Sequence, residues 1–171
     1  AGFAGNDESR NRLFEILARN DVDTSAVITL ANHKTTTKTR VIAGHQHALR
    51  LDEEDLSGVT DRDREALSDA VLAALGVQAI ILSDYGNDAV STNLCQRVIE
   101  AARQSSTPVF VKPKGAEVAK FAGASVMTTN LSELVLASGI AVANADELAR
   151  AAKSLVKSLG LKFLVVTQGA D

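Results

Sequence analysis

The sequence predicts an α/β fold in which a mostly parallel sheet is flanked by helices. Aromatic residues make up only 4% of the chain and Trp is absent, so the core must be built from Val, Ile, Leu and Ala, as in helix-covered parallel sheets. Helix and strand patterns alternate after residue 60, which is typical of βαβ units. With 171 residues, of which 46% are hydrophobic, the chain is long enough for one compact domain.

The first part of the chain is expected to hold one helix followed by strands. Residues 10–20, "RNRLFEILARN", carry apolar side chains at helical spacing and stop at turn residues. We expect no strand before this helix. Three segments rich in β-branched or alternating residues follow, namely 25–31, 37–43 and 47–52. They predict antiparallel strands or hairpins near residues 25–52.

Each later element follows from its own pattern. Short apolar runs bounded by turn residues predict buried strands, and longer amphipathic segments with capping residues predict helices. The expected strands are 77–83, 108–112, 124–129 and 162–167, and the expected helices are 60–75, 90–104, 116–123, 130–138 and 145–159.

Charge and cysteine content indicate which partners and which cellular compartment to expect. The formal net charge is -3 and the 18 Lys and Arg are spread along the chain, so neither nucleic acid nor a membrane is expected as a partner. Cys95 is the only cysteine, which excludes an intrachain disulfide and is typical of a reducing compartment. With no signal peptide pattern, the chain is expected to be cytoplasmic.

Four expected strands end in polar or glycine-rich residues, and these ends predict the ligand site. They read "SDYGND" after residue 82, "KPKG" at 112–115, "TTN" at 128–130 and "TQGAD" at 167–171. In an open parallel sheet the carboxyl ends of the strands share one edge, and ligands bind in the crevice there.

Asn130 and Glu133 have the spacing of a capping box, in which each side chain bonds the backbone of the other residue. Asn144 and Glu147 repeat that spacing before another helix, so spacing alone cannot separate a cap from a catalytic role. Placement differs, because Asn130 follows a strand at the expected ligand edge. A helix start at that edge also offers free amides to phosphate.

Other residues at this edge each have two interpretations. Thr167 and Gly169 could approach a phosphate closely or form an ordinary turn. Lys112 and Lys114 suit an anion or a solvated loop. Asp84 could hold a sugar hydroxyl or a metal-bound water, or it could simply form a turn.

Several common site types are disfavoured. His45 and His47 would share one face of a strand, but no third ligand completes a metal site in the sequence. The patterns of phosphate-loop ATPases, dinucleotide dehydrogenases and α/β-hydrolases are absent.

Four stretches, in order and spacing, resemble the ribokinase-like (PfkB) carbohydrate kinases. They are "TTTKTRVIAGHQHALRLDEED", "AIILSDYG", "PVFVKPKGAEVAKFAGASVMTTNLSEL" and "FLVVTQGAD". The first and third are similar to the heptose 7-phosphate kinase domains of ADP-heptose synthesis. This resemblance implies a ribokinase-like fold, ATP and Mg²⁺ as cofactors, and transfer of the ATP γ-phosphate to the anomeric hydroxyl of D-glycero-D-manno-heptose 7-phosphate. It is also compatible with a homodimer.

The resemblance carries roles onto named positions. Nucleotide binding is assigned to Asn130, Leu131, Ser132, Glu133, Thr167 and Gly169, with Glu133 also organising Mg²⁺ through water. Substrate binding is assigned to Arg40, Gln46, Arg50, Asp84 and Lys114. The expected organisation is a single kinase domain over residues 1–171, with a strand-rich substrate or lid region near 25–52 and a nucleotide-binding core at about 60–171.

The chain departs from the family pattern at three positions near these residues. Lys112 stands where the family usually has Asp, and Thr129 stands where it usually has Pro. Asn87 stands where the family often has Lys. No Asp of this chain matches the family's catalytic base, which lies in a Gly-Ala-Gly-Asp segment. The chain is therefore expected to be the middle portion of a kinase, truncated at both ends and inactive by itself. A non-catalytic module that binds nucleotide or a partner protein is the alternative.

Overall fold

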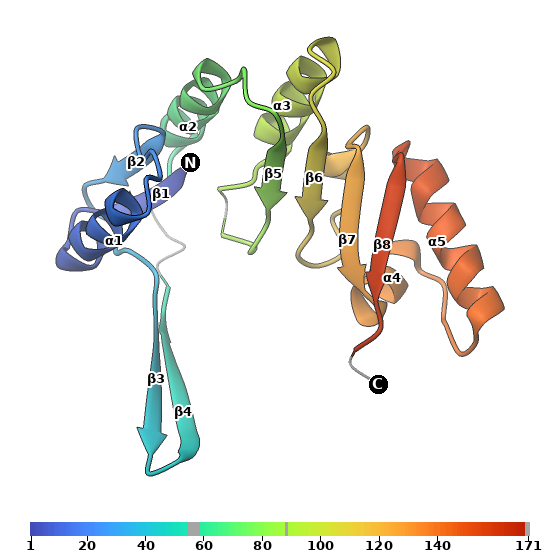
Figure 1. Ribbon diagram of the computed structural model, residues 1–171, viewed down its shortest axis with the longest axis horizontal. Coiled ribbons are helices and arrows are strands. Elements are labelled where there is room, and N and C mark those ends of the chain that lie inside the picture. The colour runs from blue at the N-terminus through green and yellow to red at the C-terminus, as the bar shows by residue number, and fades with distance from the viewer. Residues whose placement is uncertain (55–58, 88, 170–171) are drawn as a thin grey trace. The chain divides into compact units, whose positions relative to one another are not determined.

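The computed structural model describes residues 1–54, 59–87 and 89–169 and divides the chain into two compact units (Figure 1). The first unit comprises residues 1–73 and the second residues 74–171. Each unit has its own sheet structure. No helix among the described residues has the length and apolar content needed to cross a membrane.

The first unit begins with a short parallel pair of strands. Strand β1 (Gly2–Gly5) pairs in parallel with β2 (Val27–Leu30), and helix α1 (Glu8–Arg19) connects them. Two expectations were therefore wrong, because a strand precedes the helix and β2 is not part of an antiparallel region. Half of β1 is glycine, which disfavours strands, so its sequence gives no strand signal. The intervening helix makes the β1–β2 connection a crossover, which joins parallel strands.

Gly5 allows the loop before β3 to approach β1 closely. A Cβ atom at Gly5 would lie 2.2 Å from the carbonyl oxygen of His33 and 2.7 Å from the backbone nitrogen of Thr35. Asp7 fixes the same loop, because its carboxylate caps α1 at the Arg10 amide and accepts bonds of 2.7 and 2.8 Å from the Thr35 amide and hydroxyl. The start of α1 is thus tied to residues almost thirty positions further along the chain.

A long antiparallel hairpin confirms the predicted strand region. Strand β3 (Thr37–Ala43) pairs with β4 (Gln46–Glu53), and the register shifts between Val41 and Ile42. His45 lies in the connecting turn and His47 on β4, so the two imidazoles do not share a strand face as expected. Helix α2 (Asp61–Ala73) contacts β2 and belongs to the first unit.

The second unit contains the predicted parallel sheet. Its strands are β5 (Ile80–Ser83), β6 (Val109–Lys112), β7 (Val126–Asn130) and β8 (Phe163–Thr167), hydrogen-bonded in that order and all parallel. The connecting segments contain α3 (Thr92–Gln104), a 3₁₀ turn η1 (Ala119–Phe121), α4 (Leu131–Ser138) and α5 (Ala145–Leu159). The helix expected at 116–123 is reduced to η1, because so short a segment bounded by Gly115 and Gly123, both at positive φ, cannot extend an α-helix.

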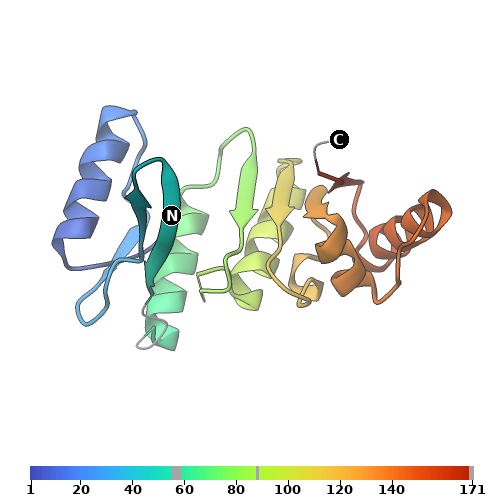
Figure 2. The same cartoon turned by 90° about the horizontal axis from the view of Figure 1, so that it is seen from below.

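The core of this unit lies on one side of the sheet. Helix α3 lies on one side of β5 and β6 (Figure 2), and its apolar stripe is buried, as are alternate residues of the strands. The buried side chains include Leu82, Leu94, Val98, Ile99, Val109, Val111, Phe121, Met127, Leu134 and Leu155. Burial of alternate strand residues places their neighbours on the opposite face.

That opposite face is apolar and open. Ile81, Phe110, Val126 and Phe163 are aligned by the strand register and form a row across all four strands. Ile81 is 75% exposed and Phe163 is 66% exposed. The row lies toward the amino-terminal half of the sheet, whereas the polar strand ends lie at the other edge.

Candidate functional site

The carboxyl ends of β7 and β8 bring the first group of candidate residues together. Asn130 and Thr167 are direct partners in the parallel register. The Thr167 hydroxyl donates to the Thr129 carbonyl at 3.4 Å, which fixes the end of β8 against the end of β7. Gly169 follows two residues later with a φ of 92°, a conformation suited to glycine. Two of the four predicted strand ends are therefore adjacent.

Asn130 and Glu133 form the predicted capping box at the start of α4. The Asn130 side-chain oxygen accepts the Glu133 amide at 2.8 Å, and Glu133 Oε2 accepts the Asn130 amide at 2.8 Å. Leu131 and Ser132 are the first residues of the helix, so their amides belong to the helix start, where no intrahelical acceptor exists. The predicted capping box is therefore confirmed.

The second Asn-x-x-Glu segment forms a different set of bonds. Asn144 caps α5 by accepting the Glu147 amide at 3.0 Å, but Glu147 Oε2 accepts the amide of Ala143 rather than that of Asn144. Glu147 also lies 3.8 Å from Arg150 on its own helix. This segment follows a connection between two helices, not a strand of the sheet. The two copies share the cap and differ in their surroundings.

Lys112, at the end of β6, adds a cation to the first box. Its Nζ lies 3.6 Å from Glu133 Oε2, with the lysine side chain 51% exposed and the glutamate side chain 21% exposed. Sequence reasoning placed both residues at the same edge of the sheet but did not predict their contact. Three neighbouring strand ends therefore converge on the start of α4.

A second group of candidate residues surrounds a cavity of about 490 Å³ beside the end of β5. Asp84 and Lys114 line it, together with Gly86, Ser91, Thr92 and Lys120. The Asp84 carboxylate forms a buried ion pair of 2.7 Å with Lys120, and its other oxygen accepts the Gly86 amide at 2.8 Å. Lys120 also donates to the Val90 carbonyl. Lys120 was missed from the sequence, because only tertiary folding brings η1 to the end of β5.

Cys95 lies next to this ion pair in the core. It is fully buried on α3, and burial raises the pKa of its thiol to about 11, with smaller influences from Lys120 and Asp84. At neutral pH the side chain is an uncharged thiol and a poor nucleophile. We therefore assign it to packing.

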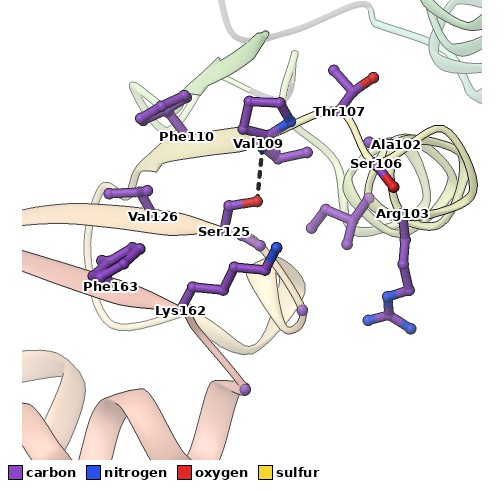
Figure 3. A pocket seen from close by; sticks show the side chains of 15 residues that line it. Ala102, Arg103, Ser106, Thr107, Val109, Phe110, Ser125, Val126, Lys162 and Phe163 are labelled. Atoms are coloured by element: carbon purple, nitrogen blue, oxygen red, sulfur yellow. Dashed lines mark hydrogen bonds between the residues drawn. The ribbon is translucent and has the colours of Figure 1, made fainter.

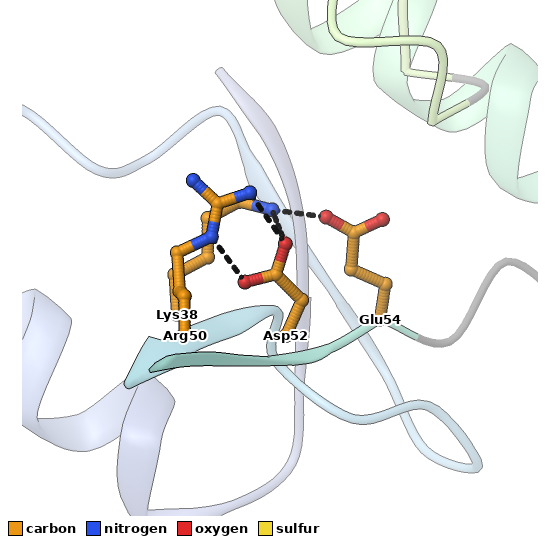
Figure 4. A network of polar contacts seen from close by, with 4 residues as sticks. All are labelled: Lys38, Arg50, Asp52 and Glu54. Carbon is orange, nitrogen blue, oxygen red and sulfur yellow. Dashed lines mark hydrogen bonds and ion pairs between the residues drawn. The ribbon is translucent and has the colours of Figure 1, made fainter. Parts of the chain in front are cut away.

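The remaining sequence candidates lie on the hairpin of the first unit. Arg40 on β3 and Arg50 on β4 are direct cross-strand partners. Arg50 forms bonds of 2.7 and 3.0 Å with Asp52, and Lys38 bonds both Asp52 and Glu54 (Figure 4). Arginine pairs directly opposite one another repel, and among the described residues a carboxylate contacts Arg50, which relieves this repulsion. Gln46 begins β4 beside the turn.

A further cavity of about 450 Å³ lies at the opposite, amino-terminal ends of β6, β7 and β8. Figure 3 shows Phe110, Val126 and Phe163 around it, with the Arg103 and Lys162 side chains nearby. Its walls are held by a 3.1 Å bond from the Val109 amide to the Ser125 hydroxyl. None of the predicted site residues lines this cavity, so it is not part of the candidate site.

Comparison with known proteins identifies the family. The sequence profile described as pfkB family carbohydrate kinase matches residues 1–171. The chain belongs to this family. A bifunctional protein HldE from Methylobacillus flagellatus is 38% identical over 173 residues, covering 100% of this chain and 36% of that protein. Another from Pelobacter propionicus is 34% identical, covering 98% of this chain and 34% of that protein. The PfkB chain thus spans about a third of the length of these relatives.

Solved structures confirm the ribokinase-like α/β fold. Phosphofructokinase-2 from Escherichia coli matches with a TM-score of 0.72 and 19% identity, over 98% of this chain and 54% of that one. A 2-dehydro-3-deoxygluconokinase from Thermotoga maritima matches with a TM-score of 0.72 and 15% identity, over 97% of this chain and 55% of that one. At these identities the match concerns the fold alone.

The family implies a magnesium nucleotide, and the residues at the start of α4 fit that group. Within the described ranges no cluster of three His, Cys, Asp or Glu residues could hold a metal by itself. Mg²⁺ in phosphate-transfer sites needs no such cluster, because it keeps several waters and takes one or two carboxylates plus phosphate oxygens. Glu133 Oε2 is engaged by the Asn130 amide and Lys112, whereas Oε1 has no bond to any described residue. That oxygen is suited to accept from metal-bound water.

Proposed function

We propose that this PfkB chain is part of a sugar kinase that transfers the ATP γ-phosphate to the anomeric hydroxyl of D-glycero-D-manno-heptose 7-phosphate. The product would enter ADP-heptose and lipopolysaccharide core synthesis. The observation that carries the proposal is the Asn130–Glu133 box at the carboxyl edge of the sheet, directly beside Thr167. Similarity to proteins named HldE over 98% or more of this chain supports the choice of a heptose phosphate.

The proposed nucleotide contacts are Asn130, Leu131, Ser132, Glu133, Thr167 and Gly169. Free amides at the start of α4 and the helix dipole favour phosphate oxygens at this position. The Thr167 hydroxyl and the bare backbone at Gly169 border the same edge. Glu133 would hold Mg²⁺ through water at Oε1, and the bound Mg²⁺ would neutralise the phosphate charge during transfer.

The proposed sugar contacts are the residues that the resemblance to the family assigns. In the first unit, Arg40, Gln46 and Arg50 would recognise the 7-phosphate, because the two arginines face each other across the hairpin and a guanidinium pairs well with a phosphate dianion. In the second unit, Asp84 and Lys114 line the cavity at the end of β5 and would suit sugar hydroxyls. Asp84 would act as an acceptor held in place by Lys120, since its two oxygens are already oriented by Lys120 and the Gly86 amide.

A substitution at Glu133 tests the nucleotide role. A capping box accepts Gln at the third helical position, so Glu133→Gln should change stability by only a few tenths of a kcal/mol. It removes the charge that would orient metal-bound water, so Mg²⁺ should strengthen ATP binding less than in the unmodified chain. Isothermal titration with ATP, with Mg²⁺ and with EDTA, gives the comparison. Glu147→Gln in the second Asn-x-x-Glu segment is the matched control, and an equal effect there would assign Glu133 to capping alone.

The chain by itself is expected not to turn over. Phosphoryl transfer needs an oriented hydroxyl as well as positioned phosphates, and no Asp of this sequence matches the family's catalytic base. In a coupled ADP-release assay with heptose 7-phosphate and magnesium ATP, we expect no turnover above background. Turnover at a rate typical of kinases would contradict this expectation and require a base among these residues.

A second candidate function is a non-catalytic module that binds nucleotide or a partner protein. Lys112 favours it, because a cation contacts the carboxylate that would organise the metal. The exposed apolar residues of the hairpin, including Ile42 and Leu51, would suit a second copy of the chain, and a homodimer is compatible with either function. Phosphorylation of heptose 7-phosphate by a longer protein that contains this chain would exclude the binding-only alternative.

A further inference from the structure

Lys112 is the one feature of the nucleotide edge that the proposed contacts do not use. It ends β6, its Nζ is 3.6 Å from Glu133 Oε2, and about half of its side chain is exposed. The same Oε2 accepts the Asn130 amide at 2.8 Å. The ammonium group is therefore held at the start of α4 by a carboxylate that cannot move without breaking the cap.

The second Asn-x-x-Glu segment shows that the cap does not need this lysine. Asn144 also caps α5, and among the described residues Glu147 forms its ion pair with Arg150, three residues further along the same helix. Such contacts within a helix are common and weak. The Lys112–Glu133 contact instead joins two strand ends of the sheet, and it places a half-exposed cation beside free helix amides.

We propose that Lys112 is a tethered counter-cation for the nucleotide phosphates, which reduces the dependence of nucleotide binding on Mg²⁺. This inference rests on the proposed nucleotide site. Without nucleotide, Lys112 neutralises Glu133. When phosphates occupy the start of α4, the half-exposed ammonium turns from Glu133 to a phosphate oxygen, and Glu133 becomes available for metal-bound water.

The charges at the site account for this role of Lys112. A metal-free nucleotide brings several negative charges toward Glu133. Among the described residues, Lys112 is the cation that contacts this carboxylate. Binding without metal should therefore depend strongly on Lys112. Mg²⁺ neutralises the same phosphates and is repelled by the ammonium group. Loss of Lys112 should therefore leave the affinity for the magnesium nucleotide unchanged or raise it slightly. Loss of Lys112 changes the dissociation constants with and without Mg²⁺ by different factors only if the lysine and the metal neutralise the same phosphates.

The test is a coupling measurement on the full 171-residue chain. The dissociation constant of ADP is measured in EDTA and in excess Mg²⁺ for the unmodified chain, Lys112→Met and Arg150→Met. We expect Lys112→Met to weaken metal-free ADP binding by up to about fivefold, as for loss of a partly exposed ion pair. The factor by which Mg²⁺ strengthens ADP binding should increase to a similar extent. Lys112→Arg should retain the behaviour of the unmodified chain, and Arg150→Met should change neither constant.

Each outcome bears on a different claim. An unchanged ratio of the two dissociation constants in Lys112→Met would overturn the inference while leaving the nucleotide site intact. The same would follow if Arg150→Met shifted the ratio equally. If the unmodified chain bound ADP under neither condition, the proposed function itself would fail for this chain, and the inference with it. Circular dichroism of each variant verifies that a weakened affinity does not reflect unfolding.

Discussion

The Thr129 side chain is 1% exposed, and its hydroxyl oxygen has no hydrogen-bond partner among the described residues. It faces the same side of β7 as Met127, within the core. A buried hydroxyl without a partner costs about 1–3 kcal/mol in desolvation, and valine has nearly the same shape. The residue immediately before the Asn130 cap therefore carries a polar atom that the fold does not use.

Thr129→Val should accordingly raise the free energy of unfolding by about 1 kcal/mol. Urea denaturation followed by circular dichroism measures it. Thr128→Val is the matched control, because that residue lies on the other face and is only half-buried, where a change within about 0.5 kcal/mol is expected. A loss of stability in Thr129→Val would mean that the hydroxyl has a partner after all.

At the scale of the element, the two capped helices of the second unit allow the effect of a cap on stability to be measured separately from its effect on nucleotide binding. Asn130→Ala and Asn144→Ala each remove one side-chain acceptor from a helix start, so each should cost about 1 kcal/mol of stability. Of the two variants, Asn130→Ala alone should also weaken ADP binding, because α4 begins at the carboxyl end of β7 whereas α5 follows a connection between two helices. Chemical denaturation and ADP titration of both variants give the comparison. Equal affinities would place the nucleotide away from α4.

The sequence predicted those elements whose own residues determine them. The strands β5 to β8 are short apolar runs followed by turn residues, and the caps of α4 and α5 are local, so both could be predicted from spacing. Strand β1 could not, because half of its residues are glycine and its pairing depends on β2, more than twenty residues away. The Lys112–Glu133 and Asp84–Lys120 contacts could not be predicted either. In each contact the two partners come from separate segments, and ion pairs between separate segments leave no periodic signal in the sequence.

At the scale of the whole molecule, hydrogen bonds to carboxylates tie the stability of the first unit to pH. They lower the pKa of four carboxyls in this unit: Asp7, Asp23, Asp52 and Asp63. For Asp7 the main cause is the hydrogen bond from the Thr35 amide, followed by that from the Arg10 amide. For Asp52 it is the hydrogen bond from the Arg50 side chain. Each bond favours the charged form.

These shifts predict that acid destabilises the first unit. A carboxyl whose pKa is lower in the folded state stabilises the fold at pH values above its unfolded pKa of about 3.9, and this contribution is lost as the pH falls through the lower, folded value. Below about pH 4 the first unit should therefore lose stability, which urea denaturation at a series of pH values measures. Asp7→Asn keeps an acceptor at the cap but cannot ionise, so it should weaken the first unit at neutral pH and reduce the dependence of its stability on pH. An unchanged pH dependence in Asp7→Asn would show instead that the acid sensitivity of the first unit does not reside in this cap.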